Sequence, residues 1–76
     1  MNDKLMNILN ELRPELDFEK ENRLIEDGIL DSFDLVSLIG EINDQFDVEI
    51  DFDDIEPENF NSAEAMIKLI ERLKEE

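Results

Sequence analysis

The most specific chemistry in this 76-residue sequence centres on one serine. Ser32 follows Asp31 where a helix is predicted to begin, and both residue types are preferred N-caps because their oxygens accept hydrogen bonds from unpaired first-turn amides. Those amides and the positive end of the helix dipole also favour a phosphate, so a hydroxyl there can carry a phosphodiester. Asp31, with Asp27 and Asp34 nearby in sequence, could recruit a divalent ion for a modifying enzyme. Ser32 is therefore either a helix cap or the attachment point of a phosphate-linked group.

Missing residue types argue against catalysis by the chain itself. The sequence contains no cysteine, which removes thiolate nucleophiles, disulfides and zinc clusters. It also contains no histidine, the side chain whose ordinary pKa suits general base work near neutrality. A serine hydrolase is the least favoured class, since no evident base accompanies Ser32. We expect a protein that is not an enzyme.

The charge balance indicates the kind of partner. Asp and Glu number 23 against 7 Lys and Arg, which gives a net charge of −16. Such a field repels nucleic acid and anionic membranes and attracts proteins with basic surfaces. No signal-peptide pattern and no apolar run that could span a bilayer are found in the sequence. We expect a monomer in the cytoplasm, without membrane insertion.

The apolar pattern predicts one small all-α domain covering residues 1–76. Leucine and isoleucine recur at helical spacing, and only two Gly and two Pro interrupt them. The expected fold is an antiparallel four-helix bundle with three main helices and a short third helix. The main helices are predicted at residues 2–13, from Asp31 or Ser32 to Phe46, and from about Ser62 onwards.

The connections between these helices carry their own predictions. Residues 15–30 form a long acidic loop, and loops of this length in compact domains are often functional. Its apolar residues are expected to cover the core: Phe18, Leu24, Ile25, Ile29 and Leu30. One short helical turn is expected around Ile55, within residues 53–59. Asn61 and Glu64 have the spacing of a capping box for the last helix.

On a helical wheel, the second helix has one face for the core and another without a partner. The core stripe consists of Leu35, Leu38, Ile39, Ile42 and Phe46. The opposite side consists of Phe33, Ser37, Gly40 and Asp44, with Val36 at its border and Asp34 and Glu41 beside it. Phe33 either folds back onto the preceding loop or faces a partner. Gly40 costs about 1 kcal/mol against alanine inside a helix. Either close approach of another backbone or of a flexible ligand offsets this cost, or the glycine is tolerated without a role.

The run Gly28-Ile-Leu-Asp31-Ser32-Phe33, followed by an amphipathic helix, resembles the attachment site of acyl carrier proteins, whose signature is Asp-Ser-Leu with an upstream glycine. The segments "FDVEI" and "NFNSAEAMIKLI" also fall where small carrier proteins have equivalents, so the resemblance covers essentially the whole chain. It implies that Ser32 carries a covalent 4'-phosphopantetheine taken from coenzyme A, which supplies the thiol that the chain lacks. It also implies a role in lipid metabolism, as in fatty-acid or specialised acyl biosynthesis.

The same resemblance implies partners and a docking face. The partners would be a phosphopantetheinyl transferase, a loading ligase for an acyl or aminoacyl group, and downstream synthases or acyltransferases with basic surfaces. They would dock on the second helix through its acidic residues, around an apolar centre and two small residues. The acidic residues are Asp31, Asp34, Glu41 and Asp44, the apolar centre is Phe33 and Val36, and the small residues are Ser37 and Gly40.

Several residues depart from the fatty-acid type of carrier. Phe33 replaces the usual leucine, Ser37 stands where a glutamate is common, and Gly40 replaces a bulkier apolar residue. An Asp-Ser-Phe site is typical of D-alanyl carrier proteins, which accept D-alanine from a ligase for transfer to teichoic acid. A D-alanyl carrier is therefore the alternative to a fatty-acid or specialised acyl carrier.

An acidic module without a prosthetic group is the alternative from another class. The segment DFDDIEPENFNS, which starts at Asp51, begins like a calcium-binding loop. It has Ile55 at the fifth position, Glu56 where glycine is required and Ser62 at the twelfth, so it does not fit an EF-hand. A protein-interaction module or a weak cation binder remains open at this level.

Overall fold

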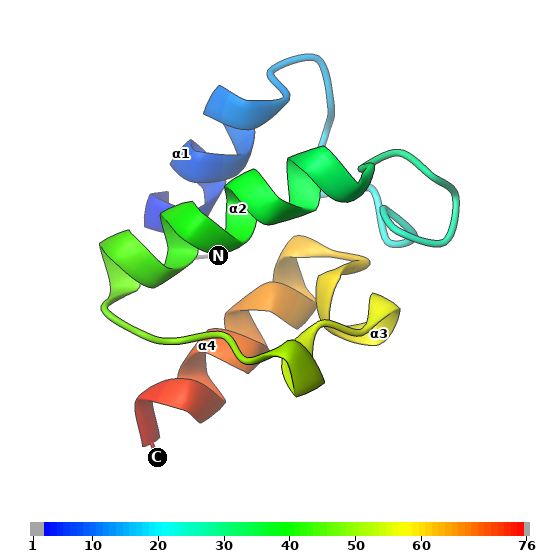
Figure 1. The fold of residues 1–76 in the computed structure, drawn as a ribbon. Helices are drawn as coiled ribbons and strands as arrows, with labels where there is room; N and C mark the ends of the chain where they lie inside the picture. The colour runs from blue at the N-terminus through cyan, green and yellow to red at the C-terminus, as the bar shows by residue number, and fades with distance from the viewer. Residues whose placement is uncertain (1–2, 76) are drawn as a thin grey trace.

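The computed structural model describes residues 3–75, and all of the regular secondary structure in this range is helical (Figure 1). Three longer helices and a short third α-helix form a small bundle, as predicted. A 3₁₀ turn, η1, precedes the short helix. The elements are α1 (Asp3–Leu12), α2 (Ser32–Phe46), η1 (Phe52–Asp54), α3 (Pro57–Phe60) and α4 (Ala63–Glu75). Asn2, where the first helix was predicted to begin, lies outside the described residues.

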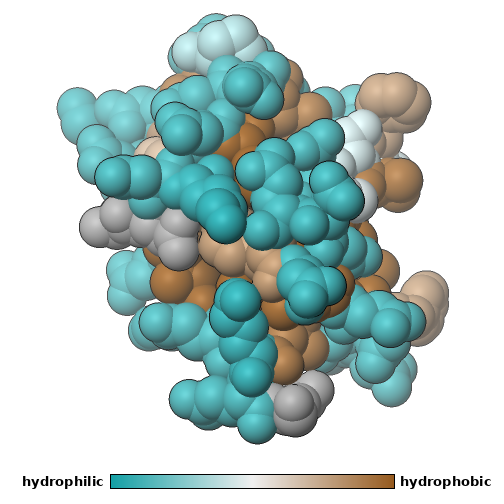
Figure 2. All heavy atoms as spheres, turned by 90° about the vertical axis from the view of Figure 1, so that its left-hand side faces the viewer, coloured by the Kyte–Doolittle hydropathy of each residue, from teal (hydrophilic) through white to brown (hydrophobic). Residues whose placement is uncertain are grey.

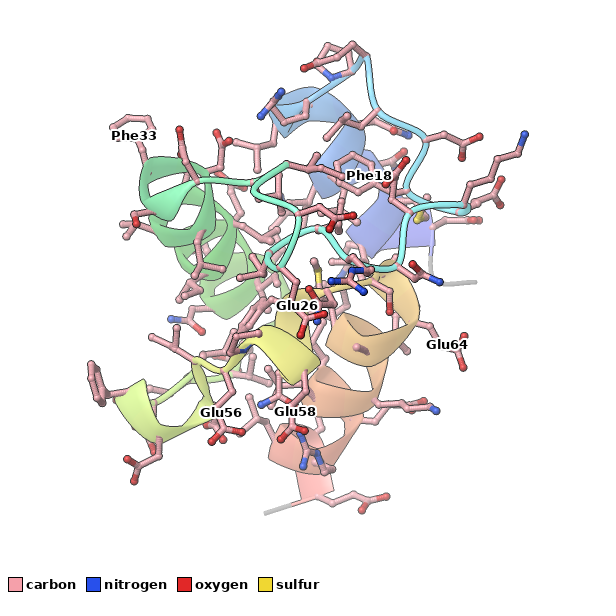
Figure 3. The ribbon with its side chains drawn as sticks, turned by 90° about the vertical axis from the view of Figure 1, so that its right-hand side faces the viewer. Phe18, Glu26, Phe33, Glu56, Glu58 and Glu64 are labelled. Carbon is pink, nitrogen blue, oxygen red and sulfur yellow. The ribbon has the colours of Figure 1, made fainter. Side chains whose placement is uncertain are left out.

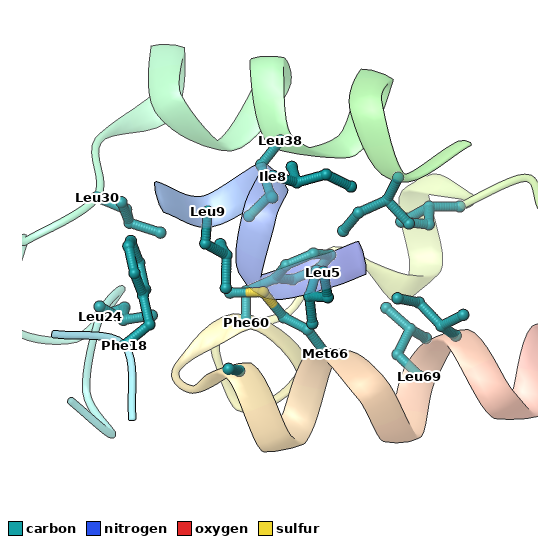
Figure 4. Close-up of a cluster of buried hydrophobic side chains, with 14 of the residues drawn as sticks. Leu5, Ile8, Leu9, Phe18, Leu24, Leu30, Leu38, Phe60, Met66 and Leu69 are labelled. Carbon is teal, nitrogen blue, oxygen red and sulfur yellow. The ribbon is translucent and has the colours of Figure 1, made fainter. Parts of the chain in front are cut away.

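The core lies between α1, α2 and α4, with α3 closing one side (Figure 4). Each long helix contributes residues spaced by three or four, the spacing that lines one face of a helix. The fully buried side chains are Leu5, Leu9, Phe18, Leu24, Leu38, Ile42, Phe60, Met66 and Leu69. Of the stripe predicted on α2, Leu38, Ile42 and Phe46 are buried, and Leu35 and Ile39 are partly buried against them. The core therefore holds the inner face of α2 and leaves its outer face to solvent.

The long connection between α1 and α2 packs against the bundle. Phe18, Leu24 and Leu30 are buried in the core, as predicted. Ile25 and Ile29 are partly buried. This packing therefore fixes the position of the loop where it leads into α2.

Hydrogen bonds to Asn61 fasten the same connection to the junction between α3 and α4. The amide of Leu24 donates to the Asn61 carbonyl at 2.9 Å. The amides of Ile25 and Glu26 both donate to Asn61 Oδ1 at 3.1 Å. One side chain thus satisfies two loop amides that lie more than thirty residues away in sequence.

Two local predictions were wrong. Ile55 is not the centre of a helical turn, because the helical residues lie on either side of it, in η1 and in α3, where Pro57 stands at the first turn. Asn61 is not the cap of α4. Ser62 takes that role, since its Oγ accepts from the amide of Ala65 at 3.0 Å while Asn61 holds the loop.

The surface is predominantly hydrophilic on the face shown in Figure 2. A few large apolar side chains are nevertheless exposed: Phe33, Val36, Phe52 and Ile55. Between residues 3 and 75, no helix has both the length and the apolar character needed to cross a bilayer.

Candidate functional site

The N-terminus of α2 is capped by Asp31. Its backbone is extended (φ −94°, ψ −176°), and its Oδ1 accepts from the amide of Asp34 at 2.8 Å. Asp34 Oδ2 accepts in return from the amide of Asp31 at 3.5 Å, which completes a capping box. Ser32 is the first residue of the helix and is exposed. The interpretation of Ser32 as the cap is therefore wrong, because the residue before it performs this function.

Gly28 has a conformational reason to be glycine. Its φ is +71°, in the left-handed region that side chains disfavour, and its amide donates to the Ile25 carbonyl at 3.1 Å. The chain reverses here and then buries Leu30, just before the cap. The upstream glycine of the sequence motif thus shapes the turn that delivers Asp31 and Ser32 to the helix start.

Arg13, at the end of α1, connects three parts of the chain beside the site. Its Nη1 donates to Asp34 Oδ2 at 2.9 Å and to the Ile29 carbonyl at 3.1 Å, and its Nε donates to Glu15 Oε2 at 2.6 Å. The hydrogen bonds to Glu15 and Asp34 raise the pKa of Arg13 above its ordinary value. A bond from its own backbone amide and one from Arg13 lower the pKa of Glu15. Sequence reasoning missed Arg13, because its partners Ile29 and Asp34 lie 16 and 21 positions away along the chain.

The acidic cluster predicted around Asp31 is not formed. Asp34 is held by Arg13, and Asp27 pairs with Arg23 at 3.2 Å on the loop. Across residues 3–75, no group of three or more carboxylates is arranged to hold a metal ion. The prediction that Asp27, Asp31 and Asp34 act together was wrong, because basic side chains take two of the three.

The outer face of α2 is open, as Figure 3 shows for Phe33 at the start of the helix. Phe33 is 79% exposed and Val36 70% exposed, so Phe33 does not fold back onto the loop. Ser37 is half-buried, and Gly40, Glu41 and Asp44 are exposed. Asp34 differs from the rest, because its side chain is 15% exposed and already paired. The role of this face in docking stays a prediction.

The helix start fits a phosphodiester-linked arm. Ser32 is exposed, and its hydroxyl is not required as a cap. The amides of Ser32 and Phe33 open the helix and have no carbonyl four residues back within it, so they can donate to an anion at the helix start. The carboxylate of Asp31 lies at the same place and would repel a phosphate. The helix dipole and the free amides attract the phosphate and so oppose this repulsion. An arm joined there would extend into solvent beside Phe33.

The structure thus places an exposed serine at the start of a helix whose cap is a separate residue. The family described as "Phosphopantetheine attachment site" matches residues 4–70. The chain belongs to this phosphopantetheine-binding carrier protein family. Its cofactor is a covalently attached 4'-phosphopantetheine, and it is a carrier rather than an enzyme.

Among individual proteins, the chain is similar to D-alanyl carrier proteins. The chain is 35% identical over 75 residues to D-alanyl carrier proteins of Bacillus cereus strains B4264 and AH187 and of Bacillus anthracis strain CDC 684. Each alignment covers 95% of this chain and 94% of the relative. No solved structure matches the chain significantly.

Proposed function

We propose that this protein carries D-alanine as a thioester on a phosphopantetheine arm attached to Ser32. The Asp31-Ser32-Phe33 site within a chain-long likeness to D-alanyl carrier proteins carries the proposal. The exposure of Ser32 and its freedom from capping support the choice of this serine. The arm supplies the thiol for the thioester, and the chain presents and directs the arm. A cytoplasmic location goes with this proposal.

The partners follow from the cargo. A phosphopantetheinyl transferase attaches the arm, a ligase activates D-alanine and loads it, and an acyltransferase removes it for a cell-surface acceptor. Docking would use Phe33 and Val36 as the apolar centre, with Asp31, Glu41 and Asp44 as the acidic surround. The exposure of all five side chains supports this surface. Asp34 contributes indirectly, by holding the helix start through Arg13.

Arm attachment is the first test. Purified chain is incubated with a phosphopantetheinyl transferase and coenzyme A, and peptide mass spectrometry locates the added mass. We expect modification of the peptide that contains Ser32 in the wild type and none in Ser32→Ala. Modification elsewhere, or none while a control carrier is loaded, would refute Ser32 as the attachment residue.

Cargo selection is the second test. The chain with its arm is offered to a D-alanine ligase with ATP and, in parallel, to ligases and transferases that donate acetyl, malonyl or long-chain acyl groups. We expect D-alanine to be loaded with the highest kcat/KM. Preferential loading of a fatty or specialised acyl group would instead establish the acyl-carrier function predicted first from the sequence.

A further inference from the structure

A groove of about 400 Å³ lies between α1 and α2, on the outer side of the bundle. Its sides are formed by Glu11 and Leu12 of α1 and by Val36, Gly40 and Glu41 of α2. A water molecule occupies about 30 Å³ of the liquid, so the groove is large enough for a long side chain. The docking surface proposed for α2 includes no residue from α1, so it does not explain why α1 forms one side of this groove.

Gly40 keeps this groove open. A Cβ built on Gly40 meets no atom within 4 Å, so no contact inside the chain requires glycine here. Its φ is not in the left-handed region either, since Gly28 is the glycine with positive φ. Glycine is nevertheless less favourable than alanine inside a helix. What this glycine does provide is the open space that a side chain at position 40 would fill.

The lining of the groove is partly apolar and partly acidic. Leu12 and Val36 provide aliphatic surface, and Val36 is 70% exposed. Glu11 and Glu41 are exposed carboxylates, one from each helix. Neither is in an ion pair within residues 3–75, and Glu41 Oε2 accepts a hydrogen bond from the side-chain Nε2 of Gln45 at 3.0 Å. The site thus combines surface for an alkyl stem with two negative charges for a cationic end.

Arginine and lysine have this combination of parts, an aliphatic stem and a charged head. An enzyme that acts on Ser32 can reach the groove while it docks. Eight residues of helix separate Ser32 from Gly40, about 12 Å along the axis. A standard protein interface buries about 800 Å² on each partner, which is wide enough to cover both positions.

We propose that the groove between α1 and α2 receives an arginine or lysine side chain of the phosphopantetheinyl transferase that modifies the chain. This inference rests on the proposed function, since the transferase must dock over Ser32. Glu11 and Glu41 bind the cationic head, and the open space at Gly40 admits the stem. The groove extends the docking surface from α2 onto α1.

The test measures the Kd of the apo protein for the transferase without coenzyme A, so that binding is read independently of arm attachment. We expect the double variant Glu11→Gln/Glu41→Gln to weaken binding about tenfold, because charge-assisted hydrogen bonds are lost while shape is kept. Its Kd should also depend less steeply on salt. Gly40→Leu should weaken binding to a similar extent by filling the groove. The double variant Glu71→Gln/Glu75→Gln, an equal charge change on α4, should leave Kd within twofold.

Each outcome decides the proposal. Values of Kd within twofold of the wild type for both groove variants, with circular dichroism showing intact folds, would overturn it. Movement of the Gly40 and Leu12 amide signals on arm attachment, without enzyme, would identify the arm as the occupant and also overturn it. If Kd responds as expected but mass spectrometry finds no arm on Ser32, the proposed function fails and the groove stands. If Ser32 is modified and Kd does not respond, the groove proposal fails and the proposed function stands.

Discussion

Neighbouring residues at the start of α2 have separate roles, and substitution can separate them. Asp31 caps the helix, with Oδ1 2.8 Å from the amide of Asp34. Ser32 is the first helical residue. Asp31→Ala should therefore destabilise the fold, whereas Ser32→Ala should remove the attachment point and leave the fold intact.

The magnitude follows from the cap geometry. Loss of an N-cap costs about 1 kcal/mol, and loss of a negative charge at a helix N-terminus adds about 0.5 kcal/mol. For a domain of this size, a total of about 1.5 kcal/mol lowers Tm by about 6–12 °C. The pair between Asp34 and Arg13 persists in this variant, so it is not counted. Ser32→Ala should change the unfolding free energy by less than about 0.5 kcal/mol.

Urea denaturation and thermal melts of both variants measure these values. Asp31→Asn is the matched control, because asparagine caps as well as aspartate but carries no charge. It should recover most of the stability lost in Asp31→Ala. A stable Asp31→Ala together with a Ser32→Ala that loses about 1 kcal/mol would show that the helix starts one residue later and would refute the assignment of the cap.

Three further predictions concern the core, the Arg13 network and the neighbouring carboxylates of Glu56 and Glu58. Ile42→Ala removes a fully buried side chain and should cost about 2–5 kcal/mol, enough to unfold much of the protein in a circular dichroism melt; a native-like melt would contradict the packing. Arg13→Gln should speed amide exchange in the first turn of α2, because Asp34 and the Ile29 carbonyl lose their donor; unchanged exchange would mean that the network does not hold the helix start. The neighbouring Glu58 raises the pKa of Glu56, so the folded chain binds a proton above pH 4.5 that the unfolded chain does not. As the pH falls from 7 to 5, the unfolding free energy of the wild type should therefore increase relative to that of Glu56→Gln. Urea titrations in which the difference between the two proteins stays constant over this range would exclude the coupling.

The sequence predicted those features that depend on local rules. Helical spacing of apolar residues gave the three long helices and the buried face of α2, including Leu38 and Ile42. The preference of aspartate and serine for helix starts gave the beginning of α2 to within one residue. It could not separate a cap at Asp31 from one at Ser32, because both residue types satisfy the same rule.

Features that depend on distant contacts were missed. Arg13 bonds to residues 16 and 21 positions away, so no local pattern shows its role. Asn61 had a favourable spacing for capping α4, but the loop amides of Ile25 and Glu26 take its oxygen. Tertiary hydrogen bonds thus decided between options that local propensity left equal. The groove beside Gly40 was likewise beyond reach, since it requires the relative placement of α1 and α2.

The hydrogen bonds between Asn61 and residues 24–26 of the loop affect the order of folding. Closing contacts between residues 24–26 and Asn61 requires a chain segment of about 36 residues to be ordered, an entropic cost that is met late. The contacts within α2 and between α3 and α4 involve much shorter segments and can form earlier. The fastened approach to Ser32 would then form later than α2 itself, whose contacts are local. A nascent chain would present this fastened attachment site only after Asn61 has emerged from the ribosome, although Ser32 itself is made about thirty residues earlier.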